Sequence, residues 1–308
     1  MITLNRLSHF YLYAVMSLLI STLPFANAVE HADLSKIASG NVQNFSKLEG
    51  FSFVAENKMT FSEDFLELNP DVAPANHTTE AIQYTTNGTD FRFDVDAHYA
   101  DGTQRYGFLI ASNEQYLQVL DKFSGPVLSL QSKNRIPHDS FDNKNVPLAV
   151  FEFLATASNS REFPTISLKD LQRPSTWSRW LSSAEIHSDE EGNRLVLAAP
   201  VVDGGKDIVT FSNESPYLPV RFRRLDSDGH LVRDVRVVAF QTFKDIRIPS
   251  EIETNLYLER GWLMTKMNTS LKSFSATGEV DPDAYSIDPS QAIRVFDLDS
   301  DMRIEVPR

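Results

Sequence analysis

The sequence predicts an α+β fold: an incomplete, strongly curved antiparallel β-barrel of about eleven strands, with helices packed over its open face. Three observations lead to this prediction. Strand-length segments of alternating apolar and polar residues follow one another from residue 51, and most of them end at Asn, Asp or Gly. No helical pattern separates these successive segments, although parallel βαβ winding would require one. Helical spacing of apolar residues occurs in two places, near the N-terminus and at 143–184.

Residues 1–28 have the pattern of a secretory signal peptide. Arg6 provides a positive start, an apolar run covers 10–20, and Ala26-Asn27-Ala28 forms a small-residue cleavage site. The apolar run is short for a membrane span, so we expect cleavage after Ala28; an uncleaved N-terminal anchor is the alternative. No cysteine follows the run, which excludes lipid attachment there. We therefore expect a periplasmic or secreted protein.

The rest of the chain, 29–308, is expected to form a single domain. A helix is predicted at 29–50, where apolar residues recur at roughly helical spacing, and a first strand meander follows at 51–132. The clearest strand of the meander covers 91–99, after a turn at Asn87-Gly88. One face of this strand is apolar: Phe91, Phe93, Val95, Ala97 and Tyr99. The other face is polar: Arg92, Asp94, Asp96 and His98. Such alternation is typical of an antiparallel sheet with one solvated face.

A helical lid insert is predicted at 143–184, between two groups of strands. Pro147 stands near a helix start, and Trp177, Trp180 and Leu181 follow at the i, i+3, i+4 spacing of a helix face. A second strand meander is predicted at 194–268, with glycine-containing turns between most of its strands. The C-terminal extension at 269–308 is acidic and contains prolines with little periodicity, so we expect it to run partly extended along the body.

The composition excludes several classes of site and partner. The 308-residue chain has a formal net charge of −13, which argues against nucleic acid or anionic lipid head groups as main partners. The absence of cysteine excludes disulfides and thiolate sites. A chain of this length buries a core without such staples. We expect it to act as a monomer.

Known catalytic motifs do not occur in the sequence. There is no G-x-S-x-G, H-E-x-x-H, G-x-G-x-x-G or P-loop pattern, and no histidines pair at metal-ligand spacing. We therefore predict no enzymatic activity and no cofactor. The alternative is a secreted hydrolase that uses Asp94 and Asp96 as paired carboxylates, with His98 beside them. The alternation of this strand places all three on its solvated face, which favours a surface role.

The acidic stretch DSDG at 226–229 is either a metal loop or a turn. Asp226 and Asp228 match the start of a calcium loop, but the third acid is missing and residue 235, where the glutamate would stand, is Val. The similar DLDSD at 297–301 lacks the glycine. We predict a turn between two strands and no metal site; whether either acidic group binds calcium is left open.

Aromatic residues gather on single faces of the predicted strands, and tryptophans occur on the predicted lid. This arrangement suits either an ordinary packed core or the wall of an apolar cavity. Taken alone, it favours the packed core.

Several stretches of the sequence together resemble one known family. They are YTTNGTDFRFDV, the tryptophan-bearing helical insert, YLPVRFRRLDSDGHLVRDVRV, IRIPSEIETNLY and YSIDP. These stretches resemble the LolA/LolB-type lipoprotein carriers and the related outer-membrane lipoprotein-sorting proteins, most strongly across 217–257. The resemblance implies an incomplete antiparallel barrel with helices over its open side. It also implies an apolar cavity between the two that takes the acyl chains of lipoproteins in the periplasm.

The resemblance implies candidate site residues and partners. The apolar residues expected to line the cavity are Phe53, Met59, Phe91, Phe93, Phe108, Phe151, Trp177, Trp180 and Phe222. Arg92 is the nearest match to the strand arginine that bonds to the lid backbone and gates the cavity. The expected ligand is a lipid or an acylated protein, with inner- or outer-membrane proteins as partners.

Three functions remain open. The first is a non-enzymatic carrier or sensor of lipid-like ligands. The second is the hydrolase based on Asp94 and Asp96. The third is a structural, envelope-interacting domain whose barrel is filled by its own side chains.

Overall fold

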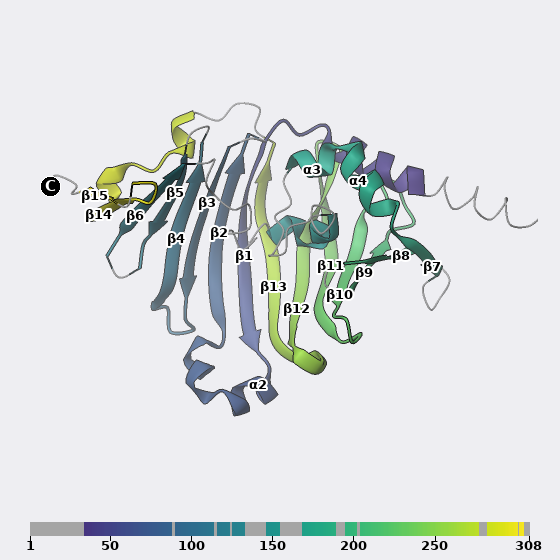
Figure 1. Ribbon diagram of the computed structural model, residues 1–308, viewed down its shortest axis with the longest axis horizontal. Coiled ribbons are helices and arrows are strands. Elements are labelled where there is room, and N and C mark those ends of the chain that lie inside the picture. The colour runs from purple at the N-terminus through teal and green to yellow at the C-terminus, as the bar shows by residue number, and fades with distance from the viewer. Residues whose placement is uncertain are drawn as a thin grey trace, which may run out of the picture.

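The computed structural model describes residues 34–87, 90–113, 116–123, 125–132, 146–154, 168–188, 195–201, 204–276, 282–300 and 302–304. The signal peptide predicted at 1–28 lies outside these residues. Figure 1 shows one broad sheet, with helical segments gathered near one of its ends.

The described residues form a fifteen-stranded sheet in the order β15-β14-β6-β5-β4-β3-β2-β1-β13-β12-β11-β10-β9-β8-β7. The strands are β1 (Phe51–Phe61), β2 (Thr78–Thr86), β3 (Phe91–His98), β4 (Gln104–Ser112), β5 (Tyr116–Asp121), β6 (Val127–Ser132), β7 (Glu185–Ser188), β8 (Leu195–Pro200), β9 (Lys206–Phe211), β10 (Pro219–Leu225), β11 (Leu231–Phe243), β12 (Ile246–Leu258), β13 (Trp262–Ser275), β14 (Arg294–Asp297) and β15 (Met302–Ile304). Neighbouring strands are antiparallel, except that β14 runs parallel to β6. Because β1 pairs with both β2 and β13, it joins the first meander to the second, while β7 and β15 remain as edges of an unclosed sheet.

The alternation of side chains gives the sheet two different faces. In β3, Phe93 and Val95 are buried, whereas Arg92 on the opposite face is only partly buried. The pairing keeps these faces aligned between strands, since Val95 lies opposite Ile82 of β2 and Phe108 of β4. We call the side of Val95, on which the helices pack, the inner face, and the side of Arg92 the outer face.

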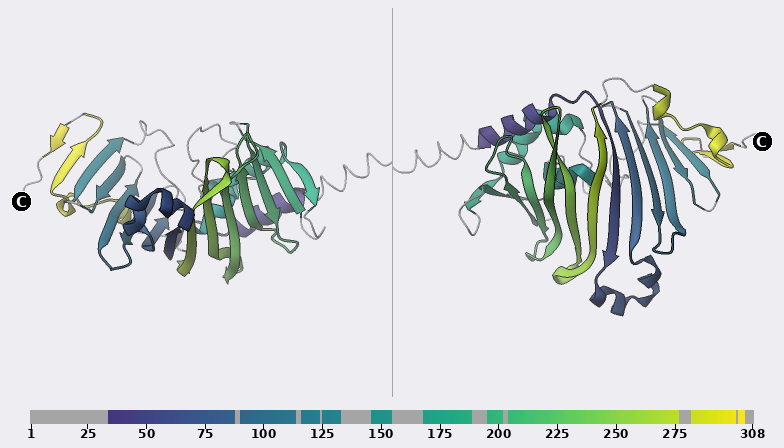
Figure 2. Two further views of the ribbon diagram at one scale, coloured as in Figure 1. Left: turned by 90° about the horizontal axis from the view of Figure 1, so that it is seen from below. Right: turned by 180° about the vertical axis from the view of Figure 1, so that it is seen from behind.

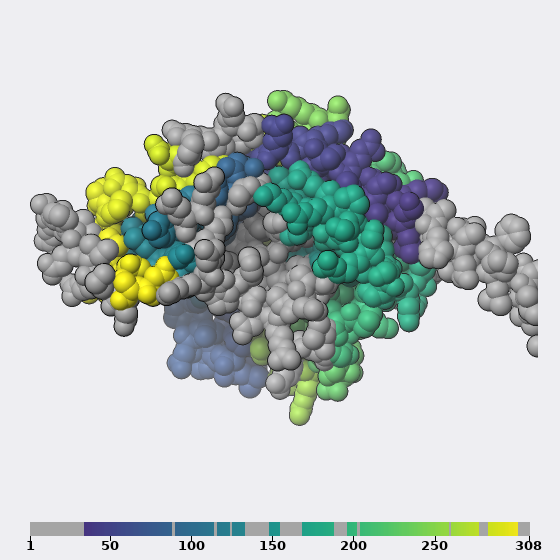
Figure 3. All heavy atoms as spheres, turned by 45° about the horizontal axis from the view of Figure 1, so that its top comes forward, coloured from purple at the N-terminus to yellow at the C-terminus, as the bar shows by residue number. Residues whose placement is uncertain are grey.

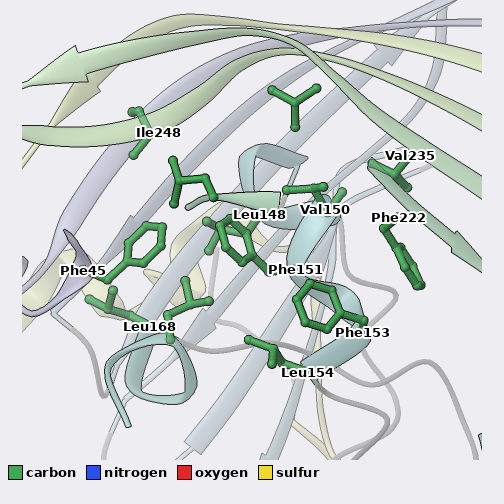
Figure 4. Packing of buried hydrophobic residues seen from close by; sticks show 14 of the residues in the cluster. Phe45, Leu148, Val150, Phe151, Phe153, Leu154, Leu168, Phe222, Val235 and Ile248 are labelled. Atoms are coloured by element: carbon green, nitrogen blue, oxygen red, sulfur yellow. The ribbon is translucent and has the colours of Figure 1, made fainter. Parts of the chain in front are cut away.

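Helical segments from two parts of the chain cover the inner face. They are a helix at 34–45, η3 (Val146–Leu154), α3 (Leu168–Gln172) and α4 (Pro174–Leu181). Figure 1 shows α3 and α4 in front of the second meander, and the view from behind in Figure 2 shows the opposite face of those strands. The 3-10 helix η3 contacts β10, β12 and α4, and so lies between helices and sheet. In Figure 4 its residues Leu148 and Phe151 lie between Leu168 of α3 and Ile248 of β12.

A second, smaller core lies on the outer face of the first meander. Leu109, Leu120 and Leu128 of β4 to β6 pack there against Ile287 and Val295 of the C-terminal extension. The extension contains two 3-10 helices, η6 (Pro282–Tyr285) and η7 (Pro289–Gln291), before it adds β14 to the sheet. The extension predicted to run along the body therefore covers apolar side chains that the first meander would otherwise expose.

The remaining helices lie at the ends of strands. The helix α2 (Glu63–Leu68) and the 3-10 helix η1 (Pro70–Ala75) connect β1 to β2. Ser62 caps α2, since the Phe65 N–H donates to its hydroxyl at 3.2 Å. The 3-10 helix η5 (Glu259–Gly261) links β12 to β13.

The predicted α+β class with an open, curved antiparallel sheet is confirmed, but the expected number of strands was too low. The additional short strands are β7, β14 and β15, which have only three or four residues each. Alternation cannot be recognised over so few residues. The helix expected around Pro147 is a 3-10 helix, and its described side chains from Leu148 to Leu154 are all buried, because it is enclosed by core on several sides.

Candidate functional site

Four of the predicted cavity residues lie together on the inner face of β1 to β4. Phe53, Phe91, Phe93 and Phe108 belong to a row of aromatic rings that Tyr84 connects. The ring centroids of Tyr84 and Phe53 are 5.3 Å apart, and those of Phe93 and Phe108 are 5.9 Å apart. Phe53 and Phe93 are buried, while Phe91 and Phe108 are half-buried. Burial also raises the pKa of the Tyr84 hydroxyl.

Four more predicted residues lie together at the helical end of the core. Phe151, Trp177, Trp180 and Phe222 are all buried. The ring of Phe153 in η3, which was not among the predicted residues, contacts those of Trp177, Trp180 and Phe222, and Phe151 contacts Trp177. The ring centroids of Phe153 and Trp180 are only 4.5 Å apart. The 3-10 helix η3 therefore lies between α4 and β10, both of which it contacts. Figure 4 shows Phe153 of η3 beside Phe222 of β10. That the two groups of residues line a ligand cavity remains a prediction.

Met59, the ninth predicted cavity residue, is half-buried beside a polar network on the inner face. It lies opposite Met267 in the β1–β13 pairing. Next to this pair, the Asn57 amide donates to the Glu80 carboxylate at 2.8 Å, and the Tyr106 hydroxyl donates to the same carboxylate. Glu80 is 3% exposed, so its charge is stabilised by these donors instead of water.

An ion pair attaches η3 to the sheet. Glu152 of η3 receives two hydrogen bonds from the Arg233 guanidinium of β11, at 2.7 and 2.9 Å. A second bidentate pair, between Asp207 and Arg224, lies on the neighbouring strands β9 and β10. The sequence analysis missed both pairs. Glu152 did carry a signal, since it is the one charged residue in the apolar run PLAVFEFL.

Arg92 lies on the outer face, on the side away from α3 and α4. Its guanidinium donates to the backbone carbonyls of Ala284 and Ser286, both at 3.3 Å. It therefore bonds to the backbone of the C-terminal extension. A role of Arg92 in lid gating remains a prediction.

The carboxylates of Asp94 and Asp96 share one ammonium group on the outer face. Lys122 contacts both of them, and its distance to Asp96 is 3.0 Å. Neither carboxylate is buried: their side chains are 25% and 40% exposed. The arrangement is that of a surface ion-pair cluster.

The DSDG stretch forms the turn of the β10–β11 hairpin. Asp226 accepts backbone N–H bonds from Asp228 and His230, at 3.0 and 2.7 Å. Although partial burial acts to raise it, these donors hold the pKa of the Asp226 carboxyl below its usual value. The Asp226, Asp228 and His230 ligand atoms lie within 4.8 Å of one another. Because the Asp226 oxygen already caps the turn, its position is explained without an ion.

An open apolar groove of about 1110 Å³ lies between the helix at 34–45 and the segment formed by α4 and β7. Its lining residues are Leu34, Ser35, Ala38, Ser39, Val42, Gln43 and Ser46 on one side, and Pro174, Ser178, Leu181, Ser182, Ala184, Glu185 and Ile186 on the other. Figure 3 shows the helix and the α3–α4 segment side by side on the surface. None of the nine predicted cavity residues lines this groove, but Trp177 and Trp180 stand on the same helix as Leu181, turned toward the core.

The groove follows from two apolar stripes on the helix at 34–45. One stripe, with Ile37 and Phe45, is buried in the inner core. The other, with Leu34, Ala38 and Val42 at four-residue spacing, is half-buried and faces the groove. A helix that carries a second apolar stripe is suited to contact an apolar ligand there.

No protein-family model and no curated protein sequence matches this chain. Several solved structures are similar to it. A LolA superfamily protein from Nitrosomonas europaea is 10% identical, with 81% of this chain and 97% of that one covered, at a TM-score of 0.40. A DUF1329 family protein from Desulfovibrio piger is 10% identical, with 82% and 97% covered, at a TM-score of 0.43. A domain described as an outer membrane lipoprotein-sorting protein, from Vibrio parahaemolyticus, is 11% identical, with 82% and 97% covered, at a TM-score of 0.42.

Two of these three are proteins of the kind that the sequence resembles. At such low identities and TM-scores, the likeness concerns the fold and carries no information on ligand or partner. Among the described residues, no helix combines the length and the apolar character that crossing a bilayer requires.

Proposed function

We propose that this chain is an exported, non-enzymatic protein that binds the acyl chain of a lipid or an acylated protein. The observation that carries the proposal is the groove of about 1110 Å³ beside the helix at 34–45. Its volume is slightly above the range of about 300–1,000 Å³ that is usual for ligand sites. The signal-peptide pattern and the family resemblance of the sequence support a periplasmic location and a role in lipoprotein sorting or transport.

The groove offers apolar contact without any catalytic group. The half-buried side chains of Leu34, Ala38 and Val42 would be removed from water together with the ligand. Burial of ten methylene groups stabilises a complex by about 8 kcal/mol. That gain corresponds to a Kd of about 1 μM before the cost of ordering the ligand. Hydrophobic burial would therefore be the main favourable contribution to binding.

A substitution in the groove tests the proposal. Ser178 of α4 is exposed and lines the groove, whereas Ser175 is exposed on the same helix and does not line it. We expect Ser178→Trp to fill the groove and weaken the binding of a fluorescent fatty acid at least about tenfold, or 1.4 kcal/mol. Ser175→Trp is the matched control and should leave the Kd unchanged. Equal affinities of wild type and both variants, or no binding by the wild type, would contradict the proposal.

A structural, envelope-interacting domain is the second candidate. It is favoured by the filling of the space beneath α4 with η3, where Phe153 contacts Trp177, Trp180 and Phe222. A core packed in this way needs no ligand to be complete. The same titration separates the two candidates, since a structural domain would not bind the fatty acid.

A further inference from the structure

A second, polar pocket of about 440 Å³ lies on the other side of the helix at 34–45. Lys47, just after the helix, and Arg247 of β12 line it together with uncharged polar residues, among them Asn44 and Thr242. Gly40 also lines it and lets the helix lie close to the loop before β10, because a Cβ there would be 2.6 Å from the Pro216 carbonyl oxygen. The pocket is therefore formed by three well separated parts of the chain.

The backbone around this pocket is fixed by direct hydrogen bonds. The Asn44 side chain donates to the Arg247 carbonyl at 2.8 Å and accepts from the Arg247 N–H at 2.9 Å, so it pairs with β12 as another strand would. The Arg247 guanidinium stacks over Phe240, with 4.7 Å between its central carbon and the ring centroid. Both contacts hold Arg247 in place beside the end of the helix.

Two cationic side chains line this pocket in a chain whose net charge is −13. The Lys47 ammonium donates to a neutral group, the Asp245 carbonyl, at 3.2 Å. Within the described part of the chain, Arg247 forms a loose ion pair with Glu214, at 3.9 Å, and the Glu214 side chain is 83% exposed. Asp245 contributes the one carboxylate among the described lining residues. Beside these two cations stand two carboxylates, Asp245 in the lining and the exposed Glu214. An anion placed between Lys47 and Arg247 would receive charge-assisted hydrogen bonds from both.

The polar pocket and the apolar groove meet at one residue. Gln43 lines both, because the groove lies along Ala38 and Val42 on one flank of the helix, and the pocket lies along Gly40 and Asn44 on the other. The Gln43 side chain is exposed. A ligand that crosses the helix at Gln43 would place an apolar part in the groove and a polar part in the pocket.

We infer that the ligand is an anionic amphiphile, whose alkyl chain lies in the groove and whose carboxylate or phosphate lies between Lys47 and Arg247. The inference rests on the proposed function and adds the charge of the head group to it. The negative net charge of the chain does not oppose such a ligand, since the groups nearest to the head group are cations.

Ligands with the same chain and different head groups test this inference. We expect wild-type protein to bind hexadecanoate at least about tenfold more tightly than hexadecanol, in competition against a fluorescent fatty acid at low salt. Lys47→Gln should remove most of this preference and leave the affinity for hexadecanol unchanged. Lys36→Gln removes the same charge from the preceding helix, at an exposed position that lines neither pocket, and should keep the preference. Arg247→Gln serves as the second variant, with the melting temperature checked first because Arg247 also stacks on Phe240.

The outcomes separate this inference from the proposed function. If hexadecanol binds as tightly as hexadecanoate, or if Lys36→Gln and Lys47→Gln act alike, the inference fails and the proposed function stands. If neither ligand binds, both fail. The third arm is inorganic phosphate alone. Phosphate that binds through Lys47 without competing with hexadecanoate would show an independent anion site and would contradict the inferred amphiphilic ligand.

Discussion

At the scale of single residues, Glu152 determines how the helical part of the inner core is attached to the sheet. It is 7% exposed, and Arg233 is its partner from β11. The other described side chains of η3 that the core encloses are apolar, so this pair is a directional contact within an otherwise non-directional packing. Removal of one partner would leave the other charge poorly solvated.

We therefore expect Glu152→Gln to lower the free energy of unfolding by about 3 kcal/mol. The measurement is urea unfolding followed by tryptophan fluorescence, since Trp177 and Trp180 are buried next to η3. The control is Lys272→Gln, which removes an exposed partner of Glu56 and should cost less than about 1 kcal/mol. If both variants lose the same free energy of unfolding, the Glu152–Arg233 pair contributes no more to stability than an exposed ion pair.

The sequence was least informative about which single polar residues would be buried. The alternation around Phe93 and Val95 correctly predicted which side of β3 is buried. It did not predict that Glu80 and Asn57 of the neighbouring strands would be buried on the same inner face, joined by a hydrogen bond. Their burial depends on partners from other strands, and those pairings are set by the register of the sheet and not by local sequence.

At the scale of elements, the C-terminal extension completes the first meander. Its strand β14 pairs in parallel with β6, with Val295 opposite Leu128. The backbone carbonyls of Ala284 in η6 and of Ser286, which follows η6, accept the Arg92 bonds. Such short elements have no periodicity of their own, so the sequence suggested only an extended tail. Their structure results from covering Leu109 and neighbouring apolar side chains on the outer face.

A charge placed under the extension should detach it. Val295 is 4% exposed in the outer core, and we expect Val295→Asp to lower the free energy of unfolding by at least about 3 kcal/mol, because an unpaired carboxylate would be buried. Limited proteolysis should then cut within the extension before the rest of the domain. The control is Ile293→Asp, two residues earlier, where the side chain is 51% exposed and the loss should stay within about 0.5 kcal/mol. Unchanged proteolysis of Val295→Asp would contradict the role of the extension as a cover.

At the scale of the whole molecule, the sequence predicted the class of the fold, and the structure adds a groove that the sequence did not indicate. The assignment of Phe151 and Trp177 to a cavity remains a prediction; in the structure Phe151 belongs to η3, and its ring packs edge-on against that of Trp177. The groove lies outside this packing, along Leu34 and Val42. Apolar spacing shows that a side chain avoids water; whether its neighbour is protein or ligand depends on how distant segments such as η3 fill the space.

The groove and the outer core lie on opposite faces of the sheet, and we expect them to act independently. Val295 and Ser178 belong to separate clusters with no shared partner. The losses of stability in Val295→Asp and Ser178→Trp should therefore add to within about 0.5 kcal/mol in the double variant. The Kd of Val295→Asp for hexadecanoate should likewise stay within about twofold of the wild type, which is less than 0.5 kcal/mol. A coupling larger than about 1 kcal/mol, or a clear loss of binding in Val295→Asp, would mean that the sheet transmits strain between its two faces, so that the fifteen strands respond as one curved body.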